Sequence, residues 1–442
     1  MKKQLITFSL LLACYISFGQ DWQPVGTGVS GYVNAMDSAN GLLYIGGDFT
    51  SAGGVTVNHL TTWNGSAYLA LGSGLSGPVY AITEYNGNII VGGDFTSAGG
   101  VPANNIAMWN GSTWSALGKG VTGISTFYNH NGVVSLTVFN NKLYATGDFD
   151  SAGGFRTNNI ARWNGTNWDS VDGGLNGAYS EGTGLCVYHK KLYVAGGFST
   201  AGNIKAKYIA RWNDTIWDSL PTCSAFGNPG SPSTFAVDSD KLYTNAYATL
   251  VVWNDTTWGS VVNNAGGDNL GTLFTYKGYL IEAGSLIGSS GGQLGNGINT
   301  YFPCLTAGPH PIMIYAVAGY KGGLFAGGRF LAGSCGAPSD SNEASYLEQF
   351  SGPLSINELT VNRTITVYPN PSNGVFTIEE QGIRDKEQVE VYNMLGEKIY
   401  YQTVIRNSQF VIDLSSQATG VYLYRITNTD GSLVSSGKLI KE

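Results

Sequence analysis

The chain has 442 residues, of which 63 are glycine, 12% are aromatic and only 12% are charged. Glycine stands at about twice its usual share, which together with the aromatic content is typical of short strands joined by tight turns and excludes a disordered chain. The formal net charge is -7 and no basic cluster follows Lys2 and Lys3, so a nucleic-acid partner is excluded.

The N-terminus predicts an export signal. Lys2 and Lys3 precede an apolar run from Leu5 to Phe18, and small residues stand ahead of Gln20. Residues 1–19 are therefore predicted to be a secretory signal peptide. A lipoprotein box at Cys14 is the alternative, although bulky Leu12 stands where that motif needs a small residue. No later run reaches the ~20 apolar residues of a membrane helix, so no transmembrane span is predicted in the mature chain.

One pattern recurs through residues 20–352. Its first copy is LYIGGDFTSAGGVTVNHLTTW, Leu43 to Trp63, and close copies start at Ile89, Leu143 and Leu192. Degenerate copies follow at Leu242, Leu280 and Leu324. Spacings of about 40 to 55 residues are those of a four-stranded propeller blade.

Each copy predicts four strands joined by turns. In the second copy these are Val79 to Thr83, Ile89 to Gly92, Asn105 to Trp109 and Trp114 to Leu117. The prediction is an all-β propeller of seven blades, with six as the alternative because residues 284–304 are too degenerate to divide. The inner strands are expected near Val33, Val79, Val134, Cys186, Phe235, Leu273 and Tyr315.

The two ends of the array predict how the ring closes. The segment from Asp21 to Gly28 matches a fourth strand with no preceding strands of its own. Ile314 to Ala318, Leu324 to Gly327 and Tyr346 to Phe350 supply strands one to three and then stop. The N- and C-terminal fragments are therefore expected to share one blade, which would pair two otherwise exposed edges.

This layout, with Gly-Gly ending the second strand and Trp in the fourth, resembles kelch-type propellers. It is more similar to secreted bacterial repeat proteins of the LYVGGxFxxAGG type. The resemblance implies a fold and leaves activity open, because propellers host binding proteins and enzymes alike.

Several recurring residues are predicted to be structural. The ten tryptophans fall on two repeat positions, which indicates packing between blades. Asp48, Asp94 and Asp148 follow Gly-Gly and are expected to accept backbone N–H groups of their own loops rather than to bind calcium. Export would place the cysteines in an oxidising compartment. Three connectivities are possible, and sequence proximity favours Cys186 with Cys223 and Cys304 with Cys335.

After a linker at residues 353–363, residues 364–442 change character. Alternating apolar and polar residues with Gly turns predict a small Ig-like β-sandwich. The elements YPNPSNG, VYNMLGE, IDLS, GVYLYRI and GKLIK, in this order, resemble the C-terminal sorting domain of type IX (Por) secretion substrates of Bacteroidetes. The motif residues are Tyr368, Pro369, Asn370, Pro371, Gly374, Gly420, Tyr422 and Lys438. The resemblance implies handling by the type IX translocon and its sortase-like peptidase, and a cell-surface or secreted product.

No catalytic motif such as GxSxG or HExxH occurs, so no catalytic, metal or cofactor residues are predicted. Loops that depart from the repeat are expected to carry any ligand site. They contribute Phe127, Tyr128, His130, Tyr179 and Glu181. The predicted function is a non-catalytic binding or adhesion module for a glycan or surface protein. The alternative is a surface hydrolase or lyase acting on polysaccharide, because carboxylates from separate blades can meet in one site.

Overall fold

The computed structural model describes residues 22–123, 132–177, 181–223, 226, 231–238, 240–246, 249–263, 272–276, 279–283, 313–329, 346–350, 365–380, 386–393, 397–405, 409–428 and 433–442. Its elements are β-strands, and these ranges contain no helix long and apolar enough to cross a bilayer. The chain divides into two units, Met1–Ser355 and Ile356–Glu442. The predicted signal peptide and linker lie outside the described residues.

The repeats form five four-stranded antiparallel sheets, as predicted for each copy. The first contains β2 (Tyr32–Ala39), β3 (Leu42–Asp48), β6 (Leu60–Trp63) and β7 (Tyr68–Ala70). The second contains β8 (Val79–Tyr85), β9 (Asn88–Gly93), β12 (Ile106–Trp109) and β13 (Trp114–Ala116). The third contains β15 (Gly132–Phe139), β16 (Lys142–Asp148), β19 (Ile160–Trp163) and β20 (Trp168–Ser170). The fourth contains β22 (Gly182–Tyr188), β23 (Lys191–Gly196), β26 (Ile209–Trp212) and β27 (Trp217–Ser219). The fifth contains β28 (Phe235–Asp238), β29 (Lys241–Ala246), β30 (Thr249–Trp253) and β31 (Trp258–Asn263).

The two ends of the repeat region meet in one sheet, here called the composite sheet. It contains β34 (Met313–Tyr320), β35 (Gly323–Arg329), β36 (Leu347–Phe350) and the N-terminal β1 (Trp22–Pro24). Strand β1 pairs with β36 so that Trp22 lies opposite Phe350, which is the pairing expected from the sequence. Before this sheet, β32 (Thr272–Tyr276) pairs with β33 (Tyr279–Ala283).

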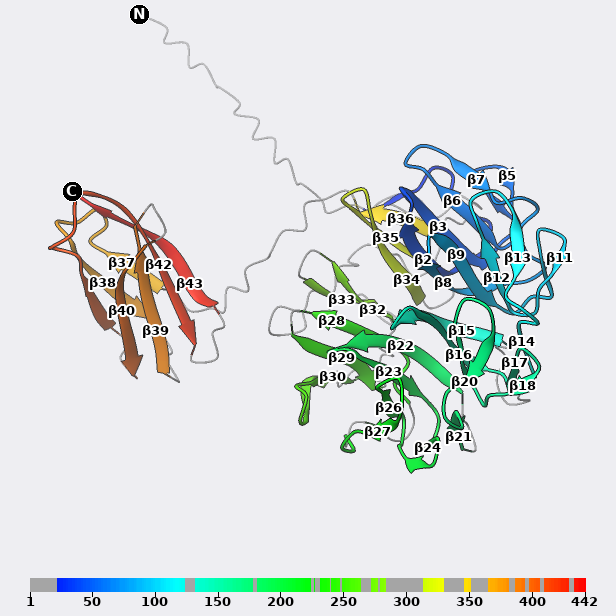
Figure 1. Ribbon diagram of the computed structural model, residues 1–442. Coiled ribbons are helices and arrows are strands. Elements are labelled where there is room, and N and C mark those ends of the chain that lie inside the picture. The colour runs from blue at the N-terminus through cyan, green and yellow to red at the C-terminus, as the bar shows by residue number, and fades with distance from the viewer. Residues whose placement is uncertain are drawn as a thin grey trace, which may run out of the picture. The chain divides into compact units, whose positions relative to one another are not determined.

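The first strands of successive sheets lie next to one another. They make contacts in the order β2, β8, β15, β22, β28, β32 and β34, and β34 contacts β2. In Figure 1 these strands lie toward the middle of the unit, whereas β7, β13, β20 and β27 lie at its periphery. Strand β34 also carries the same register irregularity near its start as β2, β8, β15 and β22.

Short hairpins after the second strands form an outer tier. They comprise β4 (Ser51–Ala52) with β5 (Val55–Thr56), β10 (Ser97–Ala98) with β11 (Val101–Pro102), β14 (Val121–Thr122) with β17 (Ser151–Ala152) and β18 (Phe155–Arg156), and β21 (Leu175–Asn176) with β24 (Thr200–Ala201) and β25 (Ile204–Lys205). The turn between β4 and β5 has φ +58° at Gly53 and +78° at Gly54, which a two-residue type I′ turn requires. A Cβ on Gly53 would also lie 2.5 Å from the Tyr68 ring, which explains the recurring Ala-Gly-Gly.

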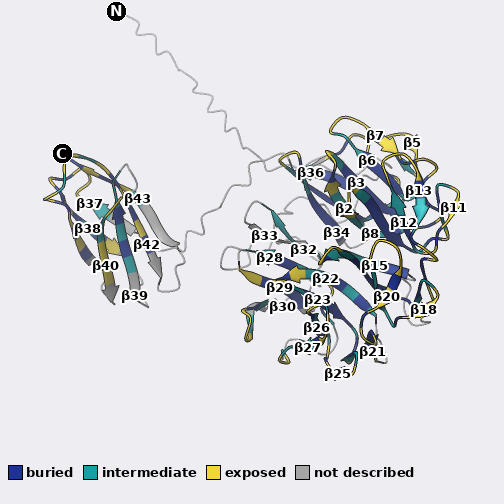
Figure 2. Cartoon of the chain, in the orientation of Figure 1, coloured by how far each residue is buried: buried dark blue, intermediate teal, exposed yellow. Residues whose placement is uncertain are grey.

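Aromatic side chains of the fourth strands join neighbouring sheets. Trp114 Nε1 donates to the Leu71 carbonyl at 2.9 Å, and Trp168 Nε1 donates to the Leu117 carbonyl at 2.7 Å. Tyr68 takes the same place in the first sheet, with its hydroxyl 2.6 Å from the Val25 carbonyl. In Figure 2 the second strands are mostly buried, and β5 is exposed. The tryptophan positions therefore serve packing between sheets, as the repeat pattern predicts.

The second unit consists of two sheets. One contains β37 (Ile365–Tyr368), β38 (Val375–Glu380) and β41 (Gln409–Asp413); the other contains β40 (Lys398–Ile405), β39 (Lys386–Tyr392), β42 (Gly420–Asn428) and β43 (Leu433–Lys441). Buried residues of both sheets, including Phe376, Ile378, Val389, Ile412 and Ile426, form one core cluster. Two sheets around a shared apolar core are the arrangement of a β-sandwich.

Candidate functional site

The inner strands of the first unit have two ends, and different residues gather at each. At one end the second strands finish in charged residues, with Asp48 in β3, Asp148 in β16 and Arg329 in β35. We call this the Asp end. At the other end, tight turns such as Asn40 and Gly41 join the first strands to the second. We call this the turn end.

The Asp end gathers aromatic and charged side chains. Tyr32 lies opposite Asp48 in the β2–β3 pair, and the Arg329 guanidinium lies 5.5 Å from the centroid of the Tyr32 ring. The Tyr346 ring meets Tyr32 edge-on at 5.6 Å. Asp48 Oδ1 is 3.6 Å from His59 Nδ1. Side chains from the first and composite sheets therefore meet at this end.

The loop that follows Asp48 is held differently from the sequence expectation. The backbone amides of Thr50 and Ser51 donate to Ser30 Oγ at 3.1 and 3.0 Å. A serine of the preceding loop thus takes these two bonds instead of the aspartate. In the part of the chain that the structure describes, no three His, Cys, Asp or Glu side chains form a metal-binding group.

Of the predicted ligand residues, Glu181 is described, whereas Phe127, Tyr128, His130 and Tyr179 lie outside the described residues. Glu181 stands at the Asp end, immediately before β22, and its carbonyl accepts the Gly197 amide at 3.1 Å. Burial and the nearby charge of Asp148 raise the pKa of Glu181 to about 7. The predicted grouping of the five side chains remains a prediction.

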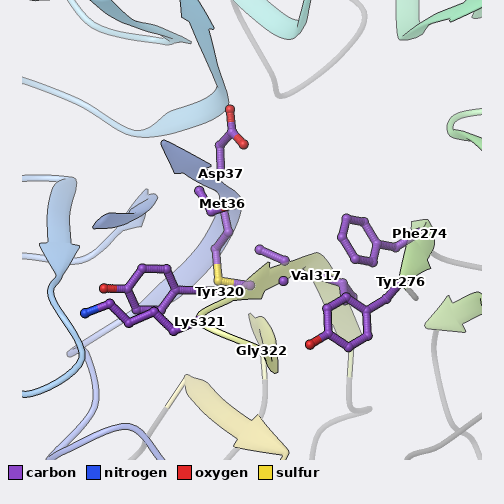
Figure 3. A pocket seen from close by; sticks show the side chains of 11 residues that line it. Met36, Asp37, Phe274, Tyr276, Val317, Tyr320, Lys321 and Gly322 are labelled. Atoms are coloured by element: carbon purple, nitrogen blue, oxygen red, sulfur yellow. The ribbon is translucent and has the colours of Figure 1, made fainter. Parts of the chain in front are cut away.

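A cavity of about 440 Å³ lies toward the turn end. Its walls come from three inner strands: β2 supplies Met36, Asp37 and Ser38, β32 supplies Phe274 and Tyr276, and β34 with its turn supplies residues 317–322. In Figure 3 Phe274 and Tyr276 stand on one side, Tyr320 and Lys321 on the other, and Met36 and Val317 between them. This volume is in the range of small-molecule sites, which typically combine an apolar wall with a few polar groups.

Asp37 lines this cavity, which we call the axial pocket because inner strands form its walls, and in Figure 3 its carboxyl group points away from Phe274 and Tyr276. Asp37 is half-buried, and Glu84 is exposed on the neighbouring inner strand β8. Burial, and then the charge of Glu84, raise the pKa of Asp37, while a hydrogen bond from the Ser38 backbone lowers it. Within the described ranges, neither carboxylate forms an ion pair with a basic side chain.

Lys321, the lysine in the pocket wall, already forms a hydrogen bond and a cation–π contact. Lys321 Nζ donates to the Asn64 carbonyl at 2.7 Å and lies 5.3 Å from the centroid of the Tyr320 ring. Tyr320 in turn donates through its hydroxyl to the Gly41 carbonyl at 2.9 Å. Both bonds run from the composite sheet to the first sheet, so these two side chains fix the pocket wall.

The predicted disulfide pairing of the cysteines is not confirmed. Cys186 and Cys223 are free thiols in the structure, so a disulfide between them is not confirmed. Burial raises the pKa of the Cys186 thiol to about 12, which keeps it protonated. Cys304 and Cys335 lie outside the described residues.

Sorting-motif residues of the second unit form hydrogen bonds with the backbone of the C-terminal strand. Asn370 donates through Nδ2 to the Lys438 carbonyl at 2.7 Å and accepts the Ile440 amide at 2.9 Å. The Ser372 amide donates to the Ile440 carbonyl, and the Ser372 carbonyl accepts the Glu442 amide, both at 3.0 Å. The motif YPNPSNG is thus a second partner for the C-terminal strand.

The other motif residues shape this junction. The peptide bonds before Pro369 and Pro371 are cis, and Gly374 has φ +113°. Tyr422 is buried, and its hydroxyl donates to the Ala418 carbonyl. Gly420 begins the strand that contains Tyr422, and the Lys438 side chain is exposed.

The sequence did not single out Lys441, which is 8% exposed. Its ammonium group donates to the carbonyls of Leu414 at 3.2 Å, Ser415 at 2.7 Å and Gln417. The available signal is alternation, because Leu439 faces the core two residues earlier. For the axial pocket, the signal is departure from the repeat: Asp37 stands where the next copies have Thr83 and Thr137.

Comparisons with known proteins identify parts of the chain. Residues 366–442 match the family described as secretion system C-terminal sorting domain. Residues 86–107 match a β-propeller domain of unknown function, DUF5122. No curated protein matches the chain. The sorting domain shows that the protein is secreted through the type IX system to the cell surface or the extracellular space.

Several solved structures are similar at low identity. The extracellular domain of BT4673 from B. thetaiotaomicron has a TM-score of 0.47 and 11% identity over 95% of this chain, which spans only 58% of that chain. A fungal alcohol oxidase of the AA5 family, in complex with copper, has a TM-score of 0.43 and 12% identity, covering 95% of this chain and 99% of that one. YjhT has a TM-score of 0.38 and 13% identity, covering 61% of this chain and 93% of that one.

Proposed function

We propose that the repeat region is a closed seven-bladed propeller that acts, after export, as a non-catalytic binding module for a glycan or a surface protein. The circular order of contacts from β2 through β34 and back to β2 supports seven blades over six. The pairing of β1 with β36 supports closure by a shared blade. In this proposal residues 1–19 are a signal peptide, residues 20–352 the propeller, and residues 353–363 a linker to the sorting domain at 364–442.

The axial pocket is the observation that carries the binding role. It joins three aromatic rings and a methionine around a cavity of about 440 Å³, and its walls come mainly from inner strands. Such a wall is preorganised, because each strand is fixed by pairing within its own sheet. A ligand could therefore bind with little loss of conformational freedom in the protein.

An array of glycans and surface proteins, probed with the exported full chain, tests this function. Binding of a defined component, lost in Tyr276→Ala and retained in Phe155→Ala, would support it. Phe155 is a suitable control because it is 70% exposed on an outer hairpin. Loss in both variants, or retention in both, would place the ligand elsewhere. The predicted loop residues Phe127, Tyr128, His130, Tyr179 and Glu181 would then be the next to substitute.

The tail is proposed to act as a folded handle for the type IX translocon and its sortase-like peptidase. The match of residues 366–442 supports this role. Deleting residues 364–442 should leave the propeller in the periplasm, as measured by cell fractionation. Normal surface delivery of the truncated chain would refute the role of the tail.

An enzyme acting on polysaccharide is the second candidate, and one observation favours it. Burial, together with the charge of Glu84 on the next inner strand, raises the pKa of Asp37, and glycoside hydrolysis uses two carboxyl groups of which one has a raised pKa. Release of reducing ends from a polysaccharide, abolished in both Asp37→Asn and Glu84→Gln, would establish this function in place of the binding role. Binding without turnover in the same assay would support the binding module.

A further inference from the structure

Two departures from the repeat meet at the Asp end. Arg329 ends β35 at the position where the first three copies carry an acid, so a cation replaces an anion there. Tyr32 begins β2 opposite Asp48, and the same position holds Pro78 in the second copy and Gly132 in the third. Strands β2 and β35 are in contact, which brings these two unusual residues of the first and composite sheets together.

The Arg329 guanidinium is held by aromatic rings. It lies over the Tyr32 ring at 5.5 Å from the centroid, and the Tyr346 ring meets Tyr32 edge-on at 5.6 Å. Such a contact engages the charge of the guanidinium and leaves its N–H donors for other partners. Among the residues that the structure describes, none forms an ion pair or a hydrogen bond with the Arg329 side chain.

The charge at this place selects an anionic ligand. The Arg329 side chain is half-buried, so its charge is less well solvated than in water, and a bound anion would stabilise it. Asp48 is the acid opposite Tyr32, but its side chain is 61% exposed and lies 3.6 Å from His59 Nδ1. Because Asp48 is screened by solvent, it opposes an anion at Arg329 only weakly.

The groups around Arg329 suit an acidic sugar. Tyr32 is 36% exposed and Tyr346 is half-buried, so ring surface is available beside the cation. The Asp48 carboxylate and the tyrosine hydroxyls can accept hydrogen bonds from the hydroxyl groups of a ligand. A sugar ring has an apolar C–H face and hydroxyl groups at its edge, which matches a site that combines aromatic surface with a few polar groups.

We propose that Arg329, Tyr32 and Tyr346 form a second ligand site, at the Asp end, that binds an acidic sugar. The carboxylate or sulfate group of the sugar binds the guanidinium, and the sugar ring lies beside the tyrosines. The proposal rests on the glycan-binding function proposed above and adds the charge of the glycan. It does not depend on the axial pocket, which lies toward the turn end.

Sugars that differ in one group test the charge. Binding of methyl glucuronoside, glucose 6-sulfate and methyl glucoside to the exported full chain can be measured by ligand-detected NMR at neutral pH and low salt. The preferred acidic sugar is expected to bind about tenfold more tightly than the glucoside, because hydrogen bonds between charged groups are the stronger ones. A preference for the glucuronoside identifies a carboxylate site, and a preference for the other acidic sugar identifies a sulfate site.

Two results would overturn the proposal at this stage. One is equal affinity for all three sugars, which would mean that the guanidinium does not contribute to binding. The other is N-acetylglutamate binding as tightly as the acidic sugars, because the site would then recognise a carboxylate without the sugar, as in an acidic peptide.

Variants locate the site. Arg329→Gln should lower the affinity for the acidic sugar about tenfold, and Arg329→Lys should stay weaker than the wild type because lysine lacks the planar fork. Tyr32→Ser should weaken binding of all three sugars, and it gives a result if Arg329→Gln does not fold. Arg156→Gln is the matched control, since Arg156 is an exposed arginine of an outer hairpin that donates to Asn158 Oδ1 at 2.9 Å. Unchanged affinity in Arg329→Gln and Tyr32→Ser, or an equal loss in Arg156→Gln, would refute the site.

The outcomes separate this inference from the function on which it rests. If the array finds a glycan whose binding depends on Tyr276 while no acidic sugar binds better than the glucoside, only the second site is wrong. If the acidic sugars bind in an Arg329-dependent way and Tyr276→Ala leaves their affinity unchanged, the second site stands apart from the axial pocket. If no sugar binds and the array is blank, both the inference and the proposed function fail.

Discussion

Gly327 of β35 faces Val33 of β2 so closely that a Cβ on the glycine would lie 2.4 Å from Val33 Cγ1. The same relationship joins Gly46 to Val79 at 2.5 Å and Gly92 to Val133 at 2.4 Å, each between neighbouring sheets. The contact between the composite sheet and the first sheet therefore repeats the contact between consecutive copies. Glycine is required at these points by close approach of the next sheet rather than by backbone conformation.

Gly327→Val should destabilise the first unit by ~1–3 kcal/mol, because the added methyl groups overpack the contact with Val33. Gly92→Val should have a similar effect at the junction of the second and third sheets. Gly259→Ala is a suitable control, since its nearest neighbour would lie 3.4 Å away. Denaturant unfolding of the full chain measures all three. A Gly327→Val protein as stable as the wild type, with Gly92→Val destabilised, would show that the composite sheet is not packed on the first.

Glu348 is expected to weaken the composite sheet as the pH rises toward and above 7. It is 2% exposed at a position where other copies have Ala107 and Ala161, and burial raises its pKa to about 7. A carboxyl that holds its proton more tightly when folded stabilises the fold at low pH, and this contribution declines between about pH 4.5 and 7. Glu348→Gln should remove that decline and raise stability at pH 8 by ~1–3 kcal/mol. Denaturant unfolding of wild type and Glu348→Gln at pH 5 and pH 8 measures this difference in stability. An unchanged pH dependence in the variant would show that Glu348 is not the group responsible.

His189 is expected to contribute a pH-dependent link between the fourth and fifth sheets. Its Nδ1 is 2.9 Å from Asp255, its Nε2 contacts Asp240, and its ring stacks on Tyr188 at 4.0 Å. The hydrogen bond to Asp240 is the main cause that raises the pKa of His189 above 6.5. The stabilisation should be complete below pH 6.5 and be lost as the pH rises through the folded-state pKa.

The matched test compares the wild type with His189→Gln and with Asp255→Asn. The difference in unfolding midpoint between wild type and His189→Gln should be largest at pH 5.5 and should decrease as the pH rises through the folded-state pKa of His189. Comparing variants removes the background from other titrating groups such as Glu348. A difference that stays constant across this range would mean that the histidine acts only by packing.

The fold was predictable where the signal is local or repeated. Gly53 and Gly54 specify their turn by themselves, and the fragments at Trp22 and Phe350 could be matched because each lacks the strands that the other supplies. The axial pocket was not predictable, because Asp37 and Tyr276 come from copies far apart in sequence, and the copy around Tyr276 is the most degenerate. Residues that meet only through contacts between sheets far apart in sequence leave no recognisable spacing in the sequence.

Lys441 should be essential for the stability of the sorting domain, although it is the penultimate residue of the chain. Its buried ammonium group donates to three carbonyls, and Lys441→Ala would leave those acceptors without the charge-assisted bonds. The expected loss is ~2–4 kcal/mol, because bonds to charged groups contribute more than neutral ones and buried acceptors would stay unsatisfied. Lys438→Ala is the control, since that side chain is exposed and Asn370 bonds to the Lys438 backbone carbonyl, which the substitution keeps. Thermal unfolding and protease resistance of the tail, together with surface delivery in cells, measure the effect. If Lys441→Ala unfolds and is delivered like Lys438→Ala, the buried ammonium group does not hold the chain end in place.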